Sequence, residues 1–194
     1  MKTISARLGC VLILGVLLGA CGSPTLRGTV IDPPFEAPDF VLTDQYGQPF
    51  QLSDQRGSVV LLFFGYTNCP DVCPTTLAIW RETYEALGED ANQVRFVYVT
   101  VDPERDTQER LATYLNAFSP DFFGLSGTAD ELDAVYKSYG VFHEKQPSPG
   151  GGDDYEVAHT STAVVIDPEG QWRVNEPYGT PAEDLVNDIQ ALLK

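Results

Sequence analysis

Two strongly apolar runs occupy residues 59–64 and 94–101. A strand of a parallel sheet that is covered on both faces has this pattern, because neither of its sides meets water. From about residue 74, apolar side chains recur at the spacing of one helix face and end before a glycine that is typical of a helix C-terminus: Leu77, Trp80, Tyr84, Leu87 and Gly88. The pattern predicts a strand–helix–strand unit at the centre of the fold.

Shorter elements are predicted on both sides of this unit. Residues 40–50 have the pattern of two short strands around a turn at Tyr46-Gly47, and residues 107–118 have an apolar helix face. The T-A-D-E run at 128–131 is a capping box for a helix that ends near Gly140. Residues 146–154, with three consecutive glycines, are expected to form a flexible loop.

The C-terminal part predicts a β-hairpin and a last helix. Residues 162–166 and 171–174 flank a D-P-E-G turn, and T-P-A-E at 180–183 has the pattern of a second capping box, with Pro181 at the first helical position. The helix is expected to reach about Leu193. Together the elements predict a thioredoxin-like α/β fold, with a central mixed sheet flanked by helices, an N-terminal hairpin, and a C-terminal hairpin plus helix.

The first 35 residues have the composition of a leader and a tether. Residues 1–20 contain Lys2, Arg7 and a short apolar run, as in an export signal, and L-G-A-C ends with Cys21 at the position that bacterial lipoproteins acylate. We therefore expect a lipoprotein signal at 1–20, a flexible tether at 21–35, and one domain at 36–194. An ordinary secretory signal or an uncleaved anchor remains the alternative.

The chain is strongly acidic, with a formal net charge of −16. Such a surface repels nucleic acid and anionic lipid headgroups, so a nucleic-acid partner is not expected. Cationic partners or metal cations would suit it, and solubility alone is an equally good explanation.

Cys69 and Cys73 are the only cysteines left once Cys10 leaves with the signal and Cys21 carries lipid. They lie between the first buried strand and its helix, where a helix N-terminus stabilises thiolate. If the segment is helical, the C-x-x-x-C spacing puts both sulfurs on one face, where they can bind a soft ion such as copper(I). A structural disulfide is the alternative.

Three further residues have chemistry that fits a metal site. His159 precedes the C-terminal hairpin, in the segment that passes beside the active cysteines in thioredoxin-like folds, and its imidazole is a good third ligand for copper. Asp71 lies between the cysteines, where its hard carboxylate suits a supporting role rather than direct ligation. His143 is expected to be a surface residue or a transient metal contact.

A charged loop follows the second buried strand, and the sequence favours neither of its two interpretations. Residues 102–106 read D-P-E-R-D and fall at the same end of the sheet as the cysteines. The loop either forms internal salt bridges or docks a partner. The two tryptophans, Trp80 and Trp172, have the positions of structural residues.

Three sequence blocks resemble the Sco/SenC family of copper-handling thioredoxin-like proteins. Residues 69–74 match C-P-D-x-C-P, residues 98–107 match the strand followed by D-P-x-R-D, and A-H-T at 158–160 matches the metal-binding histidine. The resemblance covers about residues 35–193. It implies Cys69, Cys73 and His159 as ligands of one copper ion, and membrane attachment on the exported face of the cytoplasmic membrane.

The same resemblance implies a role in building the binuclear copper centre of cytochrome c oxidase. As a metallochaperone, the protein would take copper from a donor and pass it to oxidase subunit II by ligand exchange. As a thiol–disulfide reductase, it would keep the target cysteines reduced, with an external reductant. We favour the chaperone, because a pure reductase has no evident need for His159. A peroxidase is disfavoured, because the P-x-x-x-T-x-x-C signature of peroxiredoxins is missing.

Overall fold

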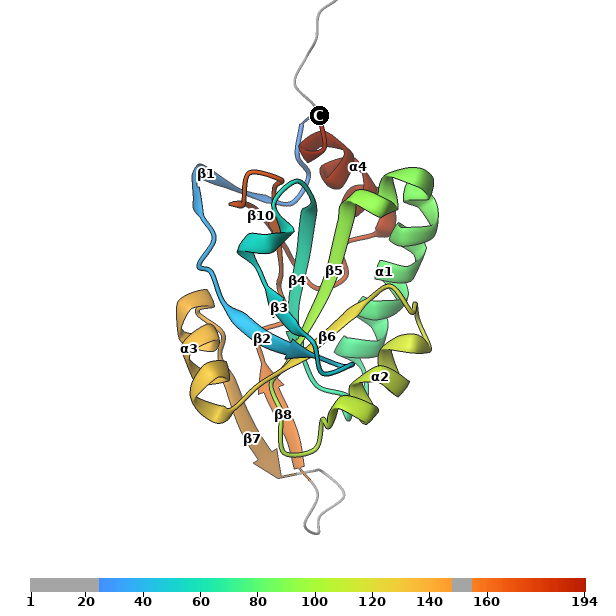
Figure 1. The fold of residues 1–194 in the computed structure, drawn as a ribbon. Helices are drawn as coiled ribbons and strands as arrows, with labels where there is room; N and C mark the ends of the chain where they lie inside the picture. Colours follow the sequence, from blue (N-terminus) through green and yellow to red (C-terminus); the bar gives the residue numbers. More distant parts are fainter. Residues whose placement is uncertain (1–24, 148–154) are drawn as a thin grey trace, which may run out of the picture.

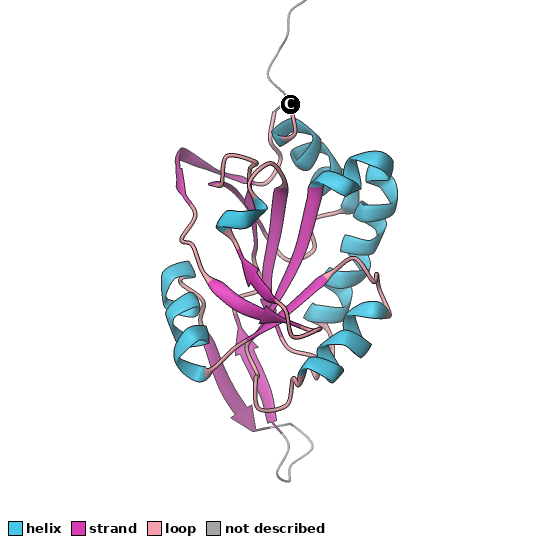
Figure 2. Cartoon of the chain, in the orientation of Figure 1, coloured by secondary structure: helices cyan, strands magenta, loops and turns pink. Residues whose placement is uncertain are grey.

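The computed structural model describes residues 25–147 and 155–194, which form an α/β fold (Figures 1 and 2). The expected signal segment and Cys21 lie outside the described residues. The main sheet has eight strands in the order β1-β10-β9-β4-β5-β6-β2-β3, and β7 and β8 form a separate two-stranded sheet. The strands are β1 Thr29–Glu36, β2 Val41–Asp44, β3 Pro49–Gln51, β4 Val59–Gly65, β5 Val94–Thr100, β6 Phe123–Ser126, β7 His143–Pro147, β8 Tyr155–His159, β9 Ala163–Ile166 and β10 Gln171–Glu176. The α-helices are α1 Val72–Leu87, α2 Gln108–Asn116, α3 Ala129–Tyr139 and α4 Ala182–Leu192.

Strand β4 is the centre of the molecule, and every one of its residues is buried. It runs parallel to β5 and antiparallel to β9, so the sheet is mixed, as predicted. On one face, Phe63 of β4 packs edge-on against Trp80 of α1. On the other face, Phe64 packs against Tyr136 of α3. Because neighbouring strand residues point to opposite faces, α1 and α3 cover opposite sides of the strand that leads into the cysteine loop.

Several local predictions are confirmed. The hairpins β2–β3 and β9–β10 form where the turn residues indicated. The capping box at the start of α3 is present, since the Thr128 side chain accepts a hydrogen bond from the Glu131 N–H and the Glu131 carboxylate accepts one from the Thr128 N–H. Gly140 ends α3 in the left-handed conformation, with φ 63°.

Other predictions are wrong. Thr29 to Phe35 do not form a flexible tether, because they belong to β1, which pairs with β10 at the sheet edge. Gln146 and Pro147 belong to strand β7 rather than to a loop. The second capping box is not formed, because α4 begins at Ala182 and the Thr180 hydroxyl donates to the Pro177 carbonyl instead.

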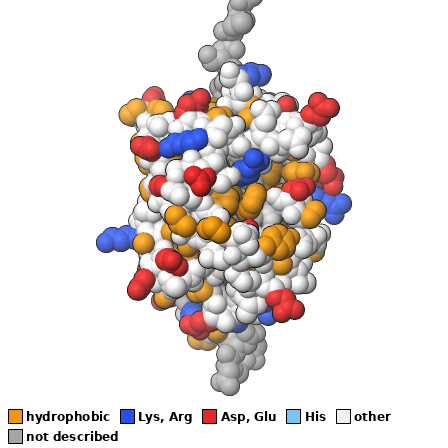
Figure 3. All heavy atoms as spheres, in the orientation of Figure 1, with side chains coloured by type: hydrophobic (Ala, Val, Ile, Leu, Met, Phe, Trp, Pro, Cys, Tyr) orange, Lys and Arg blue, Asp and Glu red, His pale blue; other side chains and the backbone are white. Residues whose placement is uncertain are grey.

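The surface combines the expected charges with scattered apolar groups. On the face drawn in Figure 3, acidic and basic side chains are interspersed and apolar side chains show between them. In the part of the chain that the structure describes, six large apolar side chains are exposed: Val30, Phe35, Val41, Tyr46, Phe142 and Tyr178. Among the described residues, no helix is both long enough and apolar enough to cross a membrane.

Candidate metal centre

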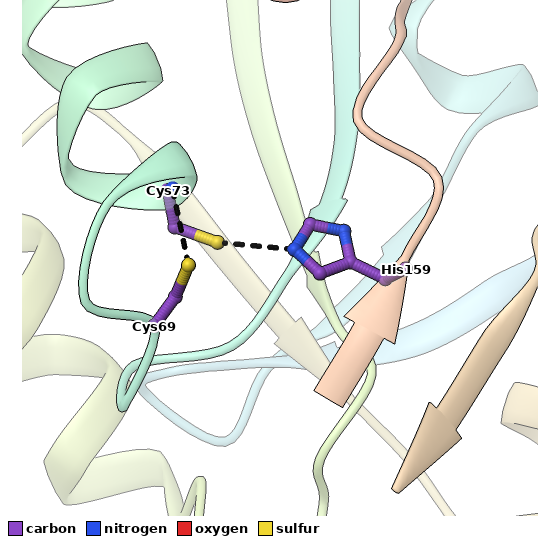
Figure 4. A group of neighbouring side chains, drawn as sticks. All are labelled: Cys69, Cys73 and His159. Atoms are coloured by element: carbon purple, nitrogen blue, oxygen red, sulfur yellow. Dashed lines mark hydrogen bonds between the residues drawn. The ribbon is translucent and has the colours of Figure 1, made fainter. Parts of the chain in front are cut away.

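The two cysteine sulfurs meet at the start of α1 (Figure 4). The helix begins at Val72, so Cys73 is in its first turn, while Cys69 lies in the preceding loop, where its N–H donates to the Tyr66 carbonyl at 3.2 Å. The segment is therefore not helical at Cys69, and the condition under which both cysteines would share a helix face is not met. Their sulfurs converge because the loop turns back, so that the Cys73 backbone N–H donates to Sγ of Cys69 at 3.4 Å.

His159 reaches the same point from the last residue of β8. Its Nε2 lies 3.5 Å from Sγ of Cys73, and its Nδ1 lies 2.9 Å from the Thr160 carbonyl oxygen. A carbonyl only accepts, so Nδ1 donates a proton to it, and Nε2 is the ring nitrogen that faces the sulfurs. The rings of Phe63 and Tyr66 pack edge-on against the imidazole, with centroids 5.9 and 5.7 Å away.

One ligand atom from each of Cys69, Cys73 and His159 lies within 4.8 Å of the other two. Both cysteines are free thiols, so the structural-disulfide alternative is not realised in this structure. The three residues that the sequence singled out as ligands are thus brought together by the fold.

The two thiols differ strongly in acidity. A hydrogen bond from the Cys73 thiol, helped by His159 and by the backbone N–H groups of Cys73 and Asp71, lowers the pKa of Cys69 to about 3. Burial, reinforced by the nearby Cys69 sulfur, raises the pKa of Cys73 far above that of an ordinary thiol. At neutral pH, Cys69 is therefore the thiolate and Cys73 the thiol that donates to it.

Close packing around Gly65 closes the site on the side of the sheet. A Cβ atom on Gly65, the last residue of β4, would lie 2.8 Å from Sγ of Cys73 and 2.7 Å from the hydroxyl of Tyr98. Only glycine leaves room for the sulfur there. The Tyr98 hydroxyl is buried and has no hydrogen-bond partner among the described residues. Neither residue was predicted as part of the site, although a glycine that ends a buried strand is a signal of close approach.

Asp71 and His143 lie outside the group of three ligands. The Asp71 side chain is exposed and makes no capping hydrogen bond at the start of α1, so its supporting role stays a prediction. His143 is directly opposite His159 in the β7–β8 register, but its ring packs against Tyr136, with centroids 4.5 Å apart.

The charged loop after β5 is tied into the structure by hydrogen bonds and ion pairs. Asp106 accepts hydrogen bonds from the backbone and hydroxyl of Thr67 and from the hydroxyl of Thr100. Arg105 pairs with Asp102 at 2.5 Å, as the salt-bridge interpretation expected. Thr67 is two residues before Cys69, so this loop supports the cysteine loop directly.

The donor set fits a soft metal ion. Thiolate sulfur and neutral imidazole are the ligands that copper(I) prefers, and Nε2 of His159 already faces the two sulfurs. Binding would require Cys73 to release its proton, which a metal ion readily drives at a thiol ligand.

The comparisons with known proteins agree with this site. The family model of SCO1/SenC matches residues 30–194. The chain belongs to the SCO1/SenC family. It is 39% identical over 149 residues to the mouse protein "Protein SCO1 homolog, mitochondrial", a match that covers 75% of this chain and 52% of the mouse protein. The chain therefore spans about half the length of that relative.

Solved structures of Sco proteins share the fold. The structure of Bradyrhizobium japonicum ScoI with copper bound has a TM-score of 0.75 and 36% identity, over 81% of this chain and 99% of that one. The solution structure of apo Sco1 from Thermus thermophilus has a TM-score of 0.77 and 40% identity, over 90% of this chain and 99% of that one. The thioredoxin-like Sco fold and the family resemblance predicted from sequence are confirmed.

Proposed function

We propose that this Sco protein is a copper metallochaperone, and that its Cys69, Cys73 and His159 hold one copper ion as cargo. The single observation that carries the proposal is the convergence of two sulfurs and one imidazole nitrogen within 4.8 Å. Support comes from the similar ScoI structure, which has copper bound. A histidine placed in this way has a clear purpose in a metal site.

The proposed client is the binuclear copper centre of cytochrome c oxidase, on subunit II, as the family resemblance implies. Copper would arrive from a donor, exchange onto the three ligands, and leave by stepwise exchange onto the client's own ligands. We propose that this takes place outside the cytoplasm, with the protein held to the outer face of the cytoplasmic membrane by lipid on Cys21. The proposed anchor and the copper donor rest on the sequence alone.

Thiol–disulfide reduction of the client is a second candidate, favoured by the unequal pKa values of the two cysteines. The Cys69 thiolate would attack a client disulfide to form a mixed disulfide and release one client thiolate. Cys73 would then give up its proton and attack Cys69, which releases the second client thiolate. The client gains two electrons, and the Cys69–Cys73 pair is oxidised to a disulfide, which an external dithiol must reduce again.

An anaerobic copper(I) titration of the reduced protein against a competing chelator tests the first candidate. One tight equivalent is expected, lost when Cys69 or Cys73 is changed to Ser and weakened at least tenfold in His159→Ala. Copper affinity no higher than that of the double Cys69→Ser/Cys73→Ser variant would overturn it. The reductase is tested in the same proteins by reduction of a disulfide-containing client peptide, which His159→Ala should leave intact.

A further inference from the structure

We infer that Asp102, Arg105 and Tyr155 form a clamp that places His159 at the metal site, so that these three are positioning residues for copper binding. The inference rests on the proposed copper function and deepens it. Among the described residues, strands β7 and β8 pair only with each other, and they project beyond one end of the main sheet (Figure 1).

Among the described residues, no backbone ladder joins β8 to the main sheet. The His159 end of β8 continues through residues 160–162 into β9, so the opposite end is the one that depends on side-chain contacts. At the end of β8 that carries His159, the contacts include the rings of Phe63 and Tyr66 and the sulfur of Cys73. At its other end is Tyr155, four residues earlier, which is the residue that the clamp holds. Contacts at Tyr155 therefore fix the direction of β8, and the direction of β8 determines where the His159 ring lies.

The clamp binds Tyr155 through three different groups. The Tyr155 hydroxyl donates to Oδ1 of Asp102 at 2.7 Å. Arg105 donates from Nη1 to the Tyr155 carbonyl at 2.9 Å and lies over the Tyr155 ring, with Cζ 3.6 Å from the ring centroid. Arg105 also pairs through Nε with the second oxygen of Asp102. The Asp102 side chain is fully buried, so this ion pair is shielded from water and its geometry is defined by hydrogen bonds at both oxygens.

The clamp also connects the histidine strand to the cysteine loop. The Asp102 N–H donates to the Thr100 hydroxyl, which donates to Asp106, and Asp106 accepts from the N–H and hydroxyl of Thr67. The cysteine loop and strand β8, which supply the sulfur and nitrogen ligands, are therefore both held by contacts with one loop, residues 102–106. An outer pair, Lys145 with Glu104 at 2.6 Å, is exposed and is expected to add little.

A double-mutant cycle tests whether the clamp acts through His159. Arg105→Gln is expected to weaken copper(I) binding about tenfold and Tyr155→Phe, which keeps the ring, about threefold, as for other groups that orient a metal ligand. In the His159→Ala background, both substitutions should change the affinity less than twofold. Equal losses with and without His159 would overturn the clamp, as would an unchanged affinity in both single variants.

Arg173→Gln is the matched control. Arg173 pairs with the buried Asp167 at 2.7 Å, as Arg105 does with Asp102. Asp167 lies at the opposite end of the sheet from the metal site, because its neighbour Ile166 pairs with Val60 near the start of β4 and the site is at Gly65, the last residue of β4. This variant should lose stability and keep its copper affinity. A tenfold loss of affinity here as well would show that any broken buried ion pair has the same effect, and would overturn the inference. If Arg105→Gln does not fold, Tyr155→Phe decides.

A measurement without metal separates this inference from the proposed function. In the reduced wild-type protein, nuclear Overhauser contacts are expected between the His159 ring and the rings of Phe63 and Tyr66, and they should weaken in Arg105→Gln and Tyr155→Phe but not in Arg173→Gln. Unchanged contacts would overturn the clamp even if copper binds. If the contacts weaken in the two clamp variants but the wild-type protein binds no copper, the clamp is retained and the metallochaperone function is rejected.

Discussion

The place that a side chain on Gly65 would need is taken by the sulfur of Cys73. A Cβ atom there would lie 2.8 Å from Sγ, closer than such contacts allow. The last residue of the central strand therefore helps to define the position of one metal ligand.

Changing Gly65 to Ala should displace Cys73 and weaken copper(I) binding at least tenfold, with a loss of stability of about 1–3 kcal/mol from overpacking. Gly124→Ala is the control, because its Cβ would press on Leu115 at 2.4 Å and not on the site. The control should lose stability and retain copper affinity. Chelator competition and urea unfolding of both variants measure the two effects, and normal affinity in Gly65→Ala would contradict the argument.

The acidity of Cys69 predicts selective alkylation. With a pKa of about 3, Cys69 is already a thiolate at pH 5, and its rate of reaction with iodoacetamide should change little between pH 5 and 8. Cys73, whose pKa is raised by burial, should remain unmodified. Mass spectrometry of the reduced protein gives the site of modification at each pH.

Cys73→Ala removes the largest cause of the low pKa and provides the control. In that variant the pKa of Cys69 should rise, so its alkylation rate at pH 5 should fall well below its rate at pH 8. Equal alkylation of both cysteines in the wild-type protein at pH 5 would contradict the assignment of Cys69 as the thiolate.

How far the sequence alone predicts this molecule depends on whether a segment has a buried face. Strand β4 was evident, because its residues are buried and apolar, and so was α3, whose capping box is local. Strands β1, β6, β7 and β8 were missed. In β1 almost every residue is exposed and in β7 every residue is, so neither shows an alternation of apolar and polar positions, while β6 and β8 are only 4 and 5 residues long.

The site was predictable to the extent that its residues have distinctive chemistry. Cysteine and histidine in a thioredoxin-like order indicated the ligands. The contact between Arg105 and Tyr155, which are 50 residues apart, could not be predicted. Arginine and tyrosine are common, and their contact exists only after the strands have assembled. Position in three dimensions, rather than residue type, makes them part of the site.

His143 provides an internal comparison for His159. The two residues are cross-strand partners, but only His159 belongs to the group of ligand atoms within 4.8 Å. His143→Ala should therefore leave the equilibrium copper affinity within about twofold of wild type, while His159→Ala loses at least tenfold. Chelator competition on the two variants is the measurement. Equal losses would mean that both imidazoles hold the metal.

Glu176, at the end of β10, predicts a pH dependence of stability that is unrelated to the metal site. Burial, with the nearby charge of Asp188, raises the pKa of this carboxyl from 4.5 to about 7, and neither of its oxygens has a hydrogen-bond partner among the described residues. The folded protein thus holds a proton that the unfolded chain releases. As pH rises from 4.5 to 7, the free energy of unfolding should fall by about 2–3 kcal/mol, and this contribution should be constant above pH 7.

Glu176→Gln removes the titrating group and keeps its shape, so the variant should be more stable than wild type at pH 8 and nearly equal to it at pH 4.5. Urea unfolding at the two pH values measures the difference. Glu169→Gln, at an exposed position in the β9–β10 turn, is the control and should leave the pH dependence unchanged. If Glu176→Gln retains the wild-type decline between pH 4.5 and 7, other groups cause it, and the folded-state pKa of Glu176 is close to the ordinary value.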